Sequence, residues 1–483
     1  MKTYSKKGIF LAGRESEFAQ PAALAKELSG GRWRPAKHLQ FLGIRLAELA
    51  AGAERFQIIS IPPRHGKSEF ISKYFPVWYL TLFPERRIIL ISYAAEFARN
   101  FSRSVRDIIE ESGERLSLEL KRGSRRAGEF ALKDYGGGMF AVGAGGSITG
   151  RGADLLIIDD PIKNNLRLHK PDFMRGLLDW FRSTAYTRLE PNGAAILVMT
   201  RWSEDDLAGE LAKRGDKWKA LSLPAFASKN DPLGREEGRA LWPERFDEDK
   251  LGEFRAELGS YWFEAMYQQS PQPRSGAAFR RKDLRYFESE GSVIRLLSPG
   301  CLLDTAGGFA PVSLGECKII AAVDLAVKIG ERNDYTACAV AAIAPKGEIA
   351  LLKMIRLQLE AADHLEFLKK IFDDWAPSAI GVESSQYQLS LVQSARRAGL
   401  PVKDLRPKGD KFARSLDMAA RVEAGTVYLL KEADWLDTFE SELLSFPNGA
   451  HDDQVDAFCY LTYMLRPSGG VSPIGVSRKE LLG

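Results

Sequence analysis

Residues 55–68 read RFQIISIPPRHGKS, and this stretch decides how the first half of the chain folds. Its apolar part, 56–61, has the length and the β-branched content of a buried strand. Gly66, Lys67 and Ser68 follow where the strand turns into a helix, and they form the core of a phosphate loop. In such a loop backbone amides hold phosphate oxygens, the lysine neutralises their charge and the serine ligates Mg²⁺. The motif is a variant, because Ile61 stands where its first glycine is usual.

A second apolar stretch, 155–158, ends in Asp159 and Asp160. A carboxylate at the tip of a buried strand can hold Mg²⁺, and its neighbour can orient an attacking water. An ordinary Asp-Pro turn after a strand is the alternative. Hydrolytic versions of this pattern usually place Glu where Asp160 stands, so Glu204 is a second candidate for the acid.

Two further motifs are consistent with a nucleotide site. Thr200 ends another apolar strand, where a polar side chain can sense the γ-phosphate. Arg151 lies in the glycine-rich loop 147–152, from which it could stabilise the transition state in a neighbouring subunit. A surface or DNA-facing arginine is the alternative for Arg151.

The pattern of apolar segments predicts two α/β domains. Strands and helices alternate from 55 to about 225, which favours a mostly parallel sheet covered by helices. The boundary is placed at the Pro/Gly/Ser-rich stretch 270–276, and a second α/β pattern runs to 466. Strands are expected in the first part at 56–61, 87–92, 139–143, 154–158, 194–199 and 217–222.

Four carboxylates in the second part form a candidate metal site. Asp324 and Glu383 end two predicted strands, and Asp453 and Asp456 lie on one face at the start of a helix. Such a set can bind two Mg²⁺ or Mn²⁺ ions, which activate water for phosphodiester hydrolysis. The order of these acids predicts an RNase H-like nuclease. Asp452 or Asp453 could instead be a helix N-cap.

Bulk composition is that of a globular protein of two domains: 483 residues, 45% hydrophobic and 27% charged. The net charge of +4 permits a polyanionic partner without requiring one. Four cysteines without a CxxC pair are typical of a reducing cytoplasm. No secretory signal and no stretch of about 20 apolar residues is found, so no membrane partner is expected.

In order and spacing, the motifs together resemble the large terminase subunit of tailed bacteriophages, a DNA-packaging motor. The segments that carry the resemblance span most of the chain. They are PPRHGKS at 62–68, ITGRGAD at 148–154, LIIDDP at 156–161, MTRW at 199–202 with EDDL at 204–207, YQQSP at 267–271 and HDDQVDA at 451–457.

The resemblance implies a role for individual residues. Lys67 and Ser68 would bind ATP phosphates and Mg²⁺, Asp159 would hold Mg²⁺, and Asp160 would take the catalytic-acid position. Thr200 and Arg201 would couple hydrolysis to movement. The other implied nucleotide contacts are Gln40, Arg64, His65 and Gly66, and the implied nuclease ligands are Asp324, Glu383, Asp452, Asp453 and Asp456.

The resemblance also implies an organisation and a set of partners. Residues 1–269 would be a P-loop (ASCE-type) ATPase motor with an N-terminal helical segment and a lid subdomain. Residues 270–315 would be a linker with an irregular insertion, 316–466 an RNase H-like nuclease and 467–483 a flexible tail.

The implied partners are double-stranded DNA, the portal protein of the procapsid and a small terminase subunit. The chain would assemble on the portal as a ring, pentameric in relatives, and could be a monomer in solution. It would act in the host bacterial cytoplasm, docked transiently on the procapsid and absent from the mature virion.

Two other functions are compatible with the motifs. One is a different ATP-dependent DNA translocase, such as a helicase–nuclease, which would need single-strand-binding loops and further helicase motifs. The other is a structural packaging adaptor with degenerate sites, for which Asp160 in place of Glu is the one hint.

Overall fold

The computed structural model describes residues 20–126, 128–148, 150–163, 171–272, 278–297, 311–325, 335–383, 386–406 and 409–465. The chain forms two units. The N-terminal unit comprises Met1–Phe254 and Tyr261–Pro273, and the C-terminal unit comprises Arg255–Ser260 and Arg274–Gly483. The expected tail 467–483 lies outside the described residues.

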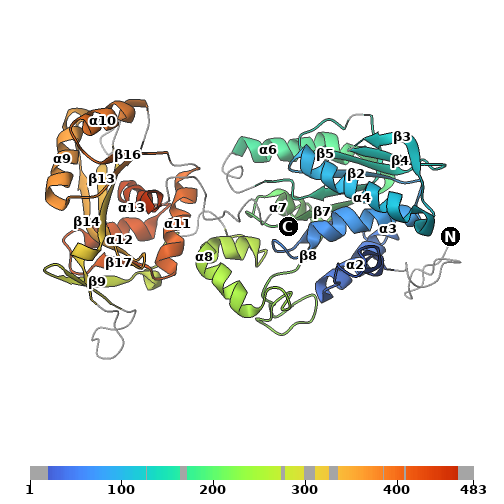
Figure 1. The fold of residues 1–483 in the computed structure, drawn as a ribbon, viewed down its shortest axis with the longest axis horizontal. Helices are drawn as coiled ribbons and strands as arrows, with labels where there is room; N and C mark the ends of the chain where they lie inside the picture. The colour runs from blue at the N-terminus through green and yellow to red at the C-terminus, as the bar shows by residue number, and fades with distance from the viewer. Residues whose placement is uncertain are drawn as a thin grey trace. The chain divides into compact units, whose positions relative to one another are not determined.

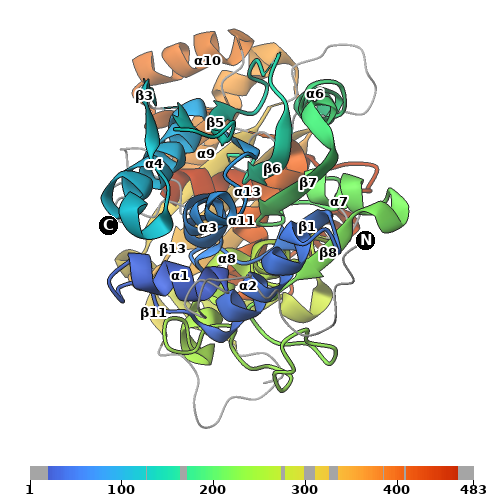
Figure 2. The same ribbon diagram turned by 90° about the vertical axis from the view of Figure 1, so that its right-hand side faces the viewer.

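An eight-stranded sheet forms the centre of the N-terminal unit, in the order β3-β4-β5-β2-β6-β7-β1-β8 (Figures 1 and 2). From β5 to β8 all pairs are parallel, and β3 and β4 add an antiparallel edge. The strands are β1 (Phe56–Ser60), β2 (Arg87–Ser92), β3 (Leu120–Arg126), β4 (Glu129–Leu132), β5 (Gly138–Gly143), β6 (Ala153–Asp159), β7 (Leu189–Met199) and β8 (Lys219–Ser222).

Both faces of this sheet are covered, because apolar side chains point alternately to either side of each strand. Ile59 and Leu155 pack on one face with the first four helices, whereas Ile58 and Leu156 pack on the other with α6 and α7. The helices are α1 (Pro21–Leu28), α2 (Lys37–Ala50), the π-helical η2 (Glu69–Tyr74) continuing into α3 (Phe75–Leu82), α4 (Ala95–Leu116), α6 (Pro171–Trp180) and α7 (Leu207–Ala212). A further helix, α8 (Glu248–Met266), contributes residues to both units.

The order of three strands positions the nucleotide-site motifs. β7 lies between β1 and β6, and all three run parallel. Their carboxyl ends therefore meet at one edge of the sheet, as in other open α/β folds that bind ligands there. Ser60 pairs with Met199, and Asp159 with Val198, so the phosphate loop, Thr200 and the two acids emerge together. The predicted mostly parallel P-loop fold is confirmed.

A nine-stranded mixed sheet forms the C-terminal unit, in the order β11-β10-β9-β17-β14-β13-β12-β15-β16. β14, β13 and β12 are antiparallel neighbours, and β15 and β16 continue parallel to β12, which is the strand order of an RNase H-like core. The strands are β9 (Tyr286–Glu290), β10 (Val293–Leu296), β11 (Val312–Ser313), β12 (Lys318–Asp324), β13 (Thr336–Ile343), β14 (Ile349–Leu357), β15 (Ile380–Glu383), β16 (Val402–Leu405) and β17 (Val427–Leu430).

Helices cover the core of this second sheet on both faces. Residues of α9 and α10 pack against apolar side chains of β12, β13 and β15, and α11, α12 and α13 form a group that packs on the opposite side through α13 (red in Figure 1). The helices are α9 (His364–Trp375), α10 (Gln386–Arg397), α11 (Lys411–Glu423), α12 (Leu436–Ser445) and α13 (Asp453–Leu465).

The segment 270–315 differs from the expected linker and irregular insertion. Within it, β9, β10 and β11 extend the second sheet, with β9 parallel to β17. The hairpin was missed because its strands are short and mostly polar outside, while its buried residues Phe287, Ile294 and Leu296 gain their partners from β14 and β17. None of the helices in the described part of the chain is long and apolar enough to cross a membrane.

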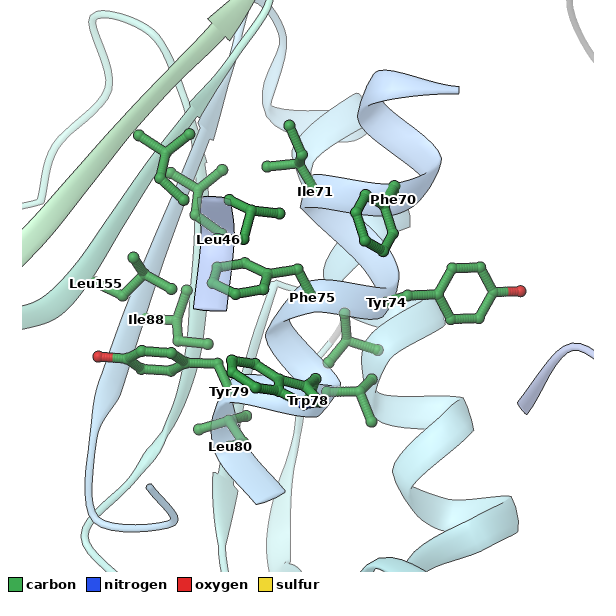
Figure 3. Close-up of a cluster of buried hydrophobic side chains, with 14 of the residues drawn as sticks. Leu46, Phe70, Ile71, Tyr74, Phe75, Trp78, Tyr79, Leu80, Ile88 and Leu155 are labelled. Carbon is green, nitrogen blue, oxygen red and sulfur yellow. The ribbon is translucent and has the colours of Figure 1, made fainter. Parts of the chain in front are cut away.

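Figure 3 shows the apolar cluster behind β1, β2 and β6, with Phe75 at its centre. Phe75 is fully buried, and its ring lies 5.8 Å from that of Trp78 and 5.9 Å from that of Tyr79. This cluster attaches the helix after the phosphate loop to the sheet. The position of that loop therefore depends on it.

We expect Phe75→Ala to lower the free energy of unfolding of the N-terminal unit by about 3–5 kcal/mol, because it leaves a cavity in a closed core. Guanidinium denaturation followed by tryptophan fluorescence measures this. Ile44→Ala is the control, since Ile44 is 48% exposed, and its cost should stay below about 1 kcal/mol. Equal losses in the two variants would contradict this description of the core.

Candidate functional sites

The phosphate loop is formed by a tight turn after β1. Gly66 has φ +82°, and a Cβ there would lie 3.1 Å from Leu39 Cδ1, so glycine is needed for both conformation and space. The Lys67 side chain is 8% exposed. Its Nζ lies 3.0 Å from Thr200 Oγ1 and 3.1 Å from Asp160 Oδ2. Lys67 thus joins the phosphate loop to the ends of β6 and β7.

Asp159 is fully buried at the end of β6. Ser68 Oγ donates to its Oδ1 at 2.9 Å and Ser72 Oγ to its Oδ2 at 2.6 Å. Burial and then the charge of Asp160 raise the pKa of Asp159, while the two serines and Lys67 act in the opposite direction. The hydroxyl donors are neutral, so they do not compensate the negative charge of this buried carboxylate. A Mg²⁺ ion shared with Ser68 would compensate it. Ser72 was not predicted.

Asp160 is held in a defined position beside Lys67. Its backbone has φ +42°, in the left-handed region that Asp tolerates better than most residues. Its Oδ1 accepts a hydrogen bond of 2.9 Å from the backbone N–H of Thr200. The Thr200 hydroxyl in turn donates to the Ile61 carbonyl at 3.3 Å. Lys67, Asp160 and Thr200, which were each assigned to the nucleotide site, therefore form one connected group, whereas Glu204 is exposed.

Arg201 takes part in a different group. Its Nε lies 3.0 and 2.9 Å from the two carboxylate oxygens of Asp206, which is fully buried and caps α7. The Arg201 backbone N–H donates to Gln269 Oε1 at 3.2 Å. Arg201 therefore links the end of β7 to α7 and to the YQQSP segment.

Two predicted residues have partners away from this group. The exposed Gln40 donates through its amide to the Pro35 carbonyl at 2.8 Å. Arg151 forms an ion pair with both carboxylate oxygens of Glu129, and its guanidinium lies 4.0 Å above the Phe140 ring. The structure joins neither of them to Lys67, and their proposed nucleotide roles stay predictions.

A buried aromatic cluster beneath the phosphate loop was not predicted. His38 Nε2 lies 2.9 Å from the His65 carbonyl oxygen, and its ring lies 5.3 Å from Trp242. The His65 ring is fully buried against Phe246, at 5.0 Å, so its side chain faces inward and only its backbone faces the phosphate side of the loop. His38 lies two residues before Gln40, and its position on the buried face of α2 was the available signal.

The second candidate site begins at two neighbouring strands of the C-terminal unit. Val323 pairs with Val382 in the parallel ladder of β12 and β15, so Asp324 and Glu383 follow side by side at the ends of these strands. α13 packs closely here, because a Cβ on Gly381 would clash with Met464 Sδ. Asp456, on the first turns of α13, is 3% exposed. Asp324, Glu383 and Asp456, three of the four predicted carboxylates, therefore come from β12, β15 and α13 to one region of this unit.

Two basic side chains of α11 lie among these acids. Lys411 Nζ lies 2.6 Å from Asp452 Oδ1 and 2.9 Å from Asp456 Oδ2. Arg414 reaches Glu383 Oε1 at 3.4 Å and Asp456 Oδ1 at 3.3 Å. Tyr460 also donates its hydroxyl to Glu383. Lys411, Arg414 and Tyr460 were missed, because nothing in the sequence says that α11 returns to this site.

The chemistry of this cluster suits a divalent cation. Burial, and then the charges of Asp456 and Glu383, raise the pKa of Asp324 well above its usual range. Carboxylate oxygens are the ligands that Mg²⁺ and Mn²⁺ prefer. A divalent cation would also relieve the repulsion between the negative charges of these carboxylates. Among the described residues, no three acids, histidines or cysteines are already arranged around a metal position.

Asp452 and Asp453, at the start of α13, have different surroundings. Asp452 pairs with Lys411. Burial and then the charge of Glu442 raise the pKa of Asp453 to about 6. Glu442, from α12, accepts hydrogen bonds from the backbone N–H groups of Gln454 and Val455 at 2.8 and 3.3 Å. Glu442 therefore satisfies N–H groups at the start of α13, a role that was considered for Asp452 or Asp453.

Two family models match the chain, one in each unit. A family described as "Terminase large subunit, T4likevirus-type, N-terminal" matches residues 58–286. A second, described as "Terminase RNaseH-like domain", matches residues 321–465. The chain belongs to the terminase large-subunit family. This large terminase is an enzyme of viral DNA packaging with an ATPase domain and a nuclease domain, as predicted.

Several solved structures resemble this terminase. The large terminase of a thermophilic bacteriophage is 12% identical, with 87% of this chain and 98% of that chain covered and a TM-score of 0.45. The HK97 bacteriophage large terminase is 13% identical, with coverages of 86% and 90% and a TM-score of 0.37. The large terminase nuclease of thermophilic phage G20c with bound zinc is 16% identical, with coverages of 40% and 100% and a TM-score of 0.28. No curated protein matches the sequence.

The buried histidines predict a pH dependence of stability. Burial lowers the pKa of His38 from 6.5 to about 4 and that of His65 from 6.5 to about 3. Because these folded-state values lie below the unfolded value, the unfolded chain binds more protons below pH 6.5, and stability falls as the pH falls. Between pH 6.5 and 5 each histidine should cost the N-terminal unit about 1.5 kcal/mol of unfolding free energy.

His38→Gln should remove about half of this loss, measured by guanidinium denaturation at several pH values. Glutamine keeps a donor for the His65 carbonyl but does not titrate. A pH dependence identical to that of the wild type would show that His38 is not buried in its neutral form.

Proposed function

We propose that the edge formed by β1, β7 and β6 hydrolyses ATP with Mg²⁺. In this proposal Lys67 and the loop amides bind the phosphates, Ser68 and Asp159 hold Mg²⁺, and Asp160 orients the attacking water. The observation that carries it is the connected group of Lys67, Asp160 and Thr200, at 3.0 and 3.1 Å. Bound Mg²⁺ would neutralise phosphate charge, and the phosphates would take the place of Asp160 as partner of Lys67.

Asp160 is connected through hydrogen bonds to the end of β7, where Thr200 and Arg201 lie. Thr200 donates from its backbone to Asp160 and from its hydroxyl to Ile61, and Arg201 is tied to α7. Loss of the γ-phosphate would change the partners of Lys67, and that change reaches β7 directly. We propose that Thr200 and Arg201 transmit hydrolysis to DNA movement by this route.

For the second site we propose a nuclease in which Asp324, Glu383 and Asp456 hold Mg²⁺ or Mn²⁺, with Asp452 or Asp453 completing the ligand set. Two such ions would activate water and stabilise the leaving oxygen of a phosphodiester. The convergence of three carboxylates from β12, β15 and α13 supports this assignment. The substrate is double-stranded DNA, which is cut once before packaging begins and again when packaging is complete.

We further propose the assembly that such a motor requires. A ring on the portal would allow Arg151 to act on the nucleotide of a neighbouring subunit, after release from Glu129. A small subunit would deliver the DNA, in the host cytoplasm. We assign residues 1–269 to the motor and 316–466 to the core of the nuclease, and the preceding segment adds β9 and β10 to the nuclease sheet.

Lys67→Ala should reduce DNA-stimulated ATP hydrolysis by at least about 100-fold, because the phosphates lose their main positive partner. Phosphate release in the presence of double-stranded DNA measures this. Lys73→Ala is the matched control, since Lys73 lies further along the helix that follows the loop and pairs with Glu69. Equal rates for Lys67→Ala and the wild type would refute the motor assignment.

Asp324→Ala should abolish plasmid cleavage with Mn²⁺ and leave ATP hydrolysis unchanged, because Asp324 belongs only to the carboxylate cluster of the C-terminal unit. Asp434→Ala, which removes an acid paired with Lys353 elsewhere in that unit, should cut like the wild type. Cleavage that survives in Asp324→Ala would place the nuclease site elsewhere.

A further inference from the structure

The nuclease cluster contains a cation of its own. We propose that Lys411 is a displaceable counter-ion that holds the carboxylates in a metal-free resting state, and that a divalent metal must expel it in order to bind. The inference rests on the proposed nuclease function. It adds a residue that sets metal affinity, and therefore the conditions under which the site can cut.

The first step is that Lys411 and a metal compete for the same oxygen atoms. Lys411 Nζ bridges Asp452 Oδ1 at 2.6 Å and Asp456 Oδ2 at 2.9 Å. An ammonium group is only a donor, so it cannot join the ligands of a metal, and its charge repels one. With Lys411 in this position, a metal at Asp456 Oδ2 would share that oxygen with an ammonium group and stand close to its positive charge.

The second step concerns which of the two basic residues can leave. The Lys411 side chain is 48% exposed, and Lys411 is the first residue of α11. Its flexible stem can turn the charge into water at little cost. Arg414 is only 10% exposed and is also bonded to the Tyr460 hydroxyl at 3.2 Å. Arg414 is therefore a fixed part of the site, and Lys411 is the movable one.

The third step is the energetic coupling. The stabilisation that Lys411 gives to the metal-free protein is lost when the metal enters, so it weakens metal binding by the same free energy. Removal of its charge should therefore have two opposite effects. The metal-free protein should become less stable, because Asp452 and Asp456 lose their counter-ion, and metal binding should become tighter.

The test is Mn²⁺ titration by calorimetry on the full chain without nucleotide, for wild type, Lys411→Met, Lys411→Gln and Lys353→Met. Asp324→Ala identifies the binding event that belongs to the cluster. We expect both Lys411 variants to bind Mn²⁺ about fivefold more tightly at that site. In EDTA their Tm should lie below that of the wild type, and saturating Mn²⁺ should raise it by a larger interval.

Lys353→Met is the matched control, because Lys353 is 34% exposed and pairs with Asp434 in the same unit. Its Mn²⁺ affinity should stay within about twofold of the wild type. Lys411→Gln keeps a hydrogen-bond donor without charge and covers the case in which Lys411→Met folds poorly.

Unchanged or weaker Mn²⁺ binding in both Lys411 variants, with the cluster site intact in the wild type, would overturn the counter-ion role alone. Absence of any Asp324-dependent Mn²⁺ binding in the wild type and in every variant would instead overturn the proposed metal site. The two failures are therefore distinguishable by calorimetry, without reference to cleavage.

Discussion

The parallel pairing of β1, β7 and β6 is the constraint on which the motor site depends. It fixes where three chain segments end, so Lys67, Thr200 and Asp160 meet at one edge of the sheet. It also buries Asp159 completely, a cost that Ser68 and Ser72 partly offset by donating to both carboxylate oxygens. The apolar cluster around Phe75 keeps the serine-bearing helix in the position that this requires.

The C-terminal unit uses the same placement of acids at neighbouring strand ends but balances their charge differently. In the motor site Asp159 has hydroxyl donors, which can remain as a metal arrives. In the nuclease site Asp456 is paired with Lys411 and Arg414, two full charges. A metal can therefore join the first acid without displacing a cation, whereas it must compete for the second. The two sites would respond differently to the free concentration of divalent ions.

The sequence was sufficient for those features that local pattern determines. Strands such as β2 and β12 are continuous apolar runs, and an acid at the end of each relevant strand marked both sites. β9 and β10 could not be predicted in this way, because β9 joins the sheet by pairing with β17, far along the chain, and β10 joins it by pairing with β9. His38, Lys411 and Arg414 were missed for the same reason. Each acts on a segment that only tertiary packing brings to it.

Asp160 shows why one departure from a motif need not imply a degenerate site. Its backbone N–H donates to the Val198 carbonyl at 2.9 Å, and its side chain accepts from the Thr200 N–H at the same distance. Both contacts are made where β6 and β7 end, so backbone pairing sets the distance between the Asp160 backbone and the partners of its carboxylate. The short side chain of Asp spans that distance. A Glu held by the same bonds would have to accommodate one additional methylene group between its backbone and its carboxylate. The shorter acid is thus accommodated by its register with β7, and the substitution alone does not favour a purely structural role.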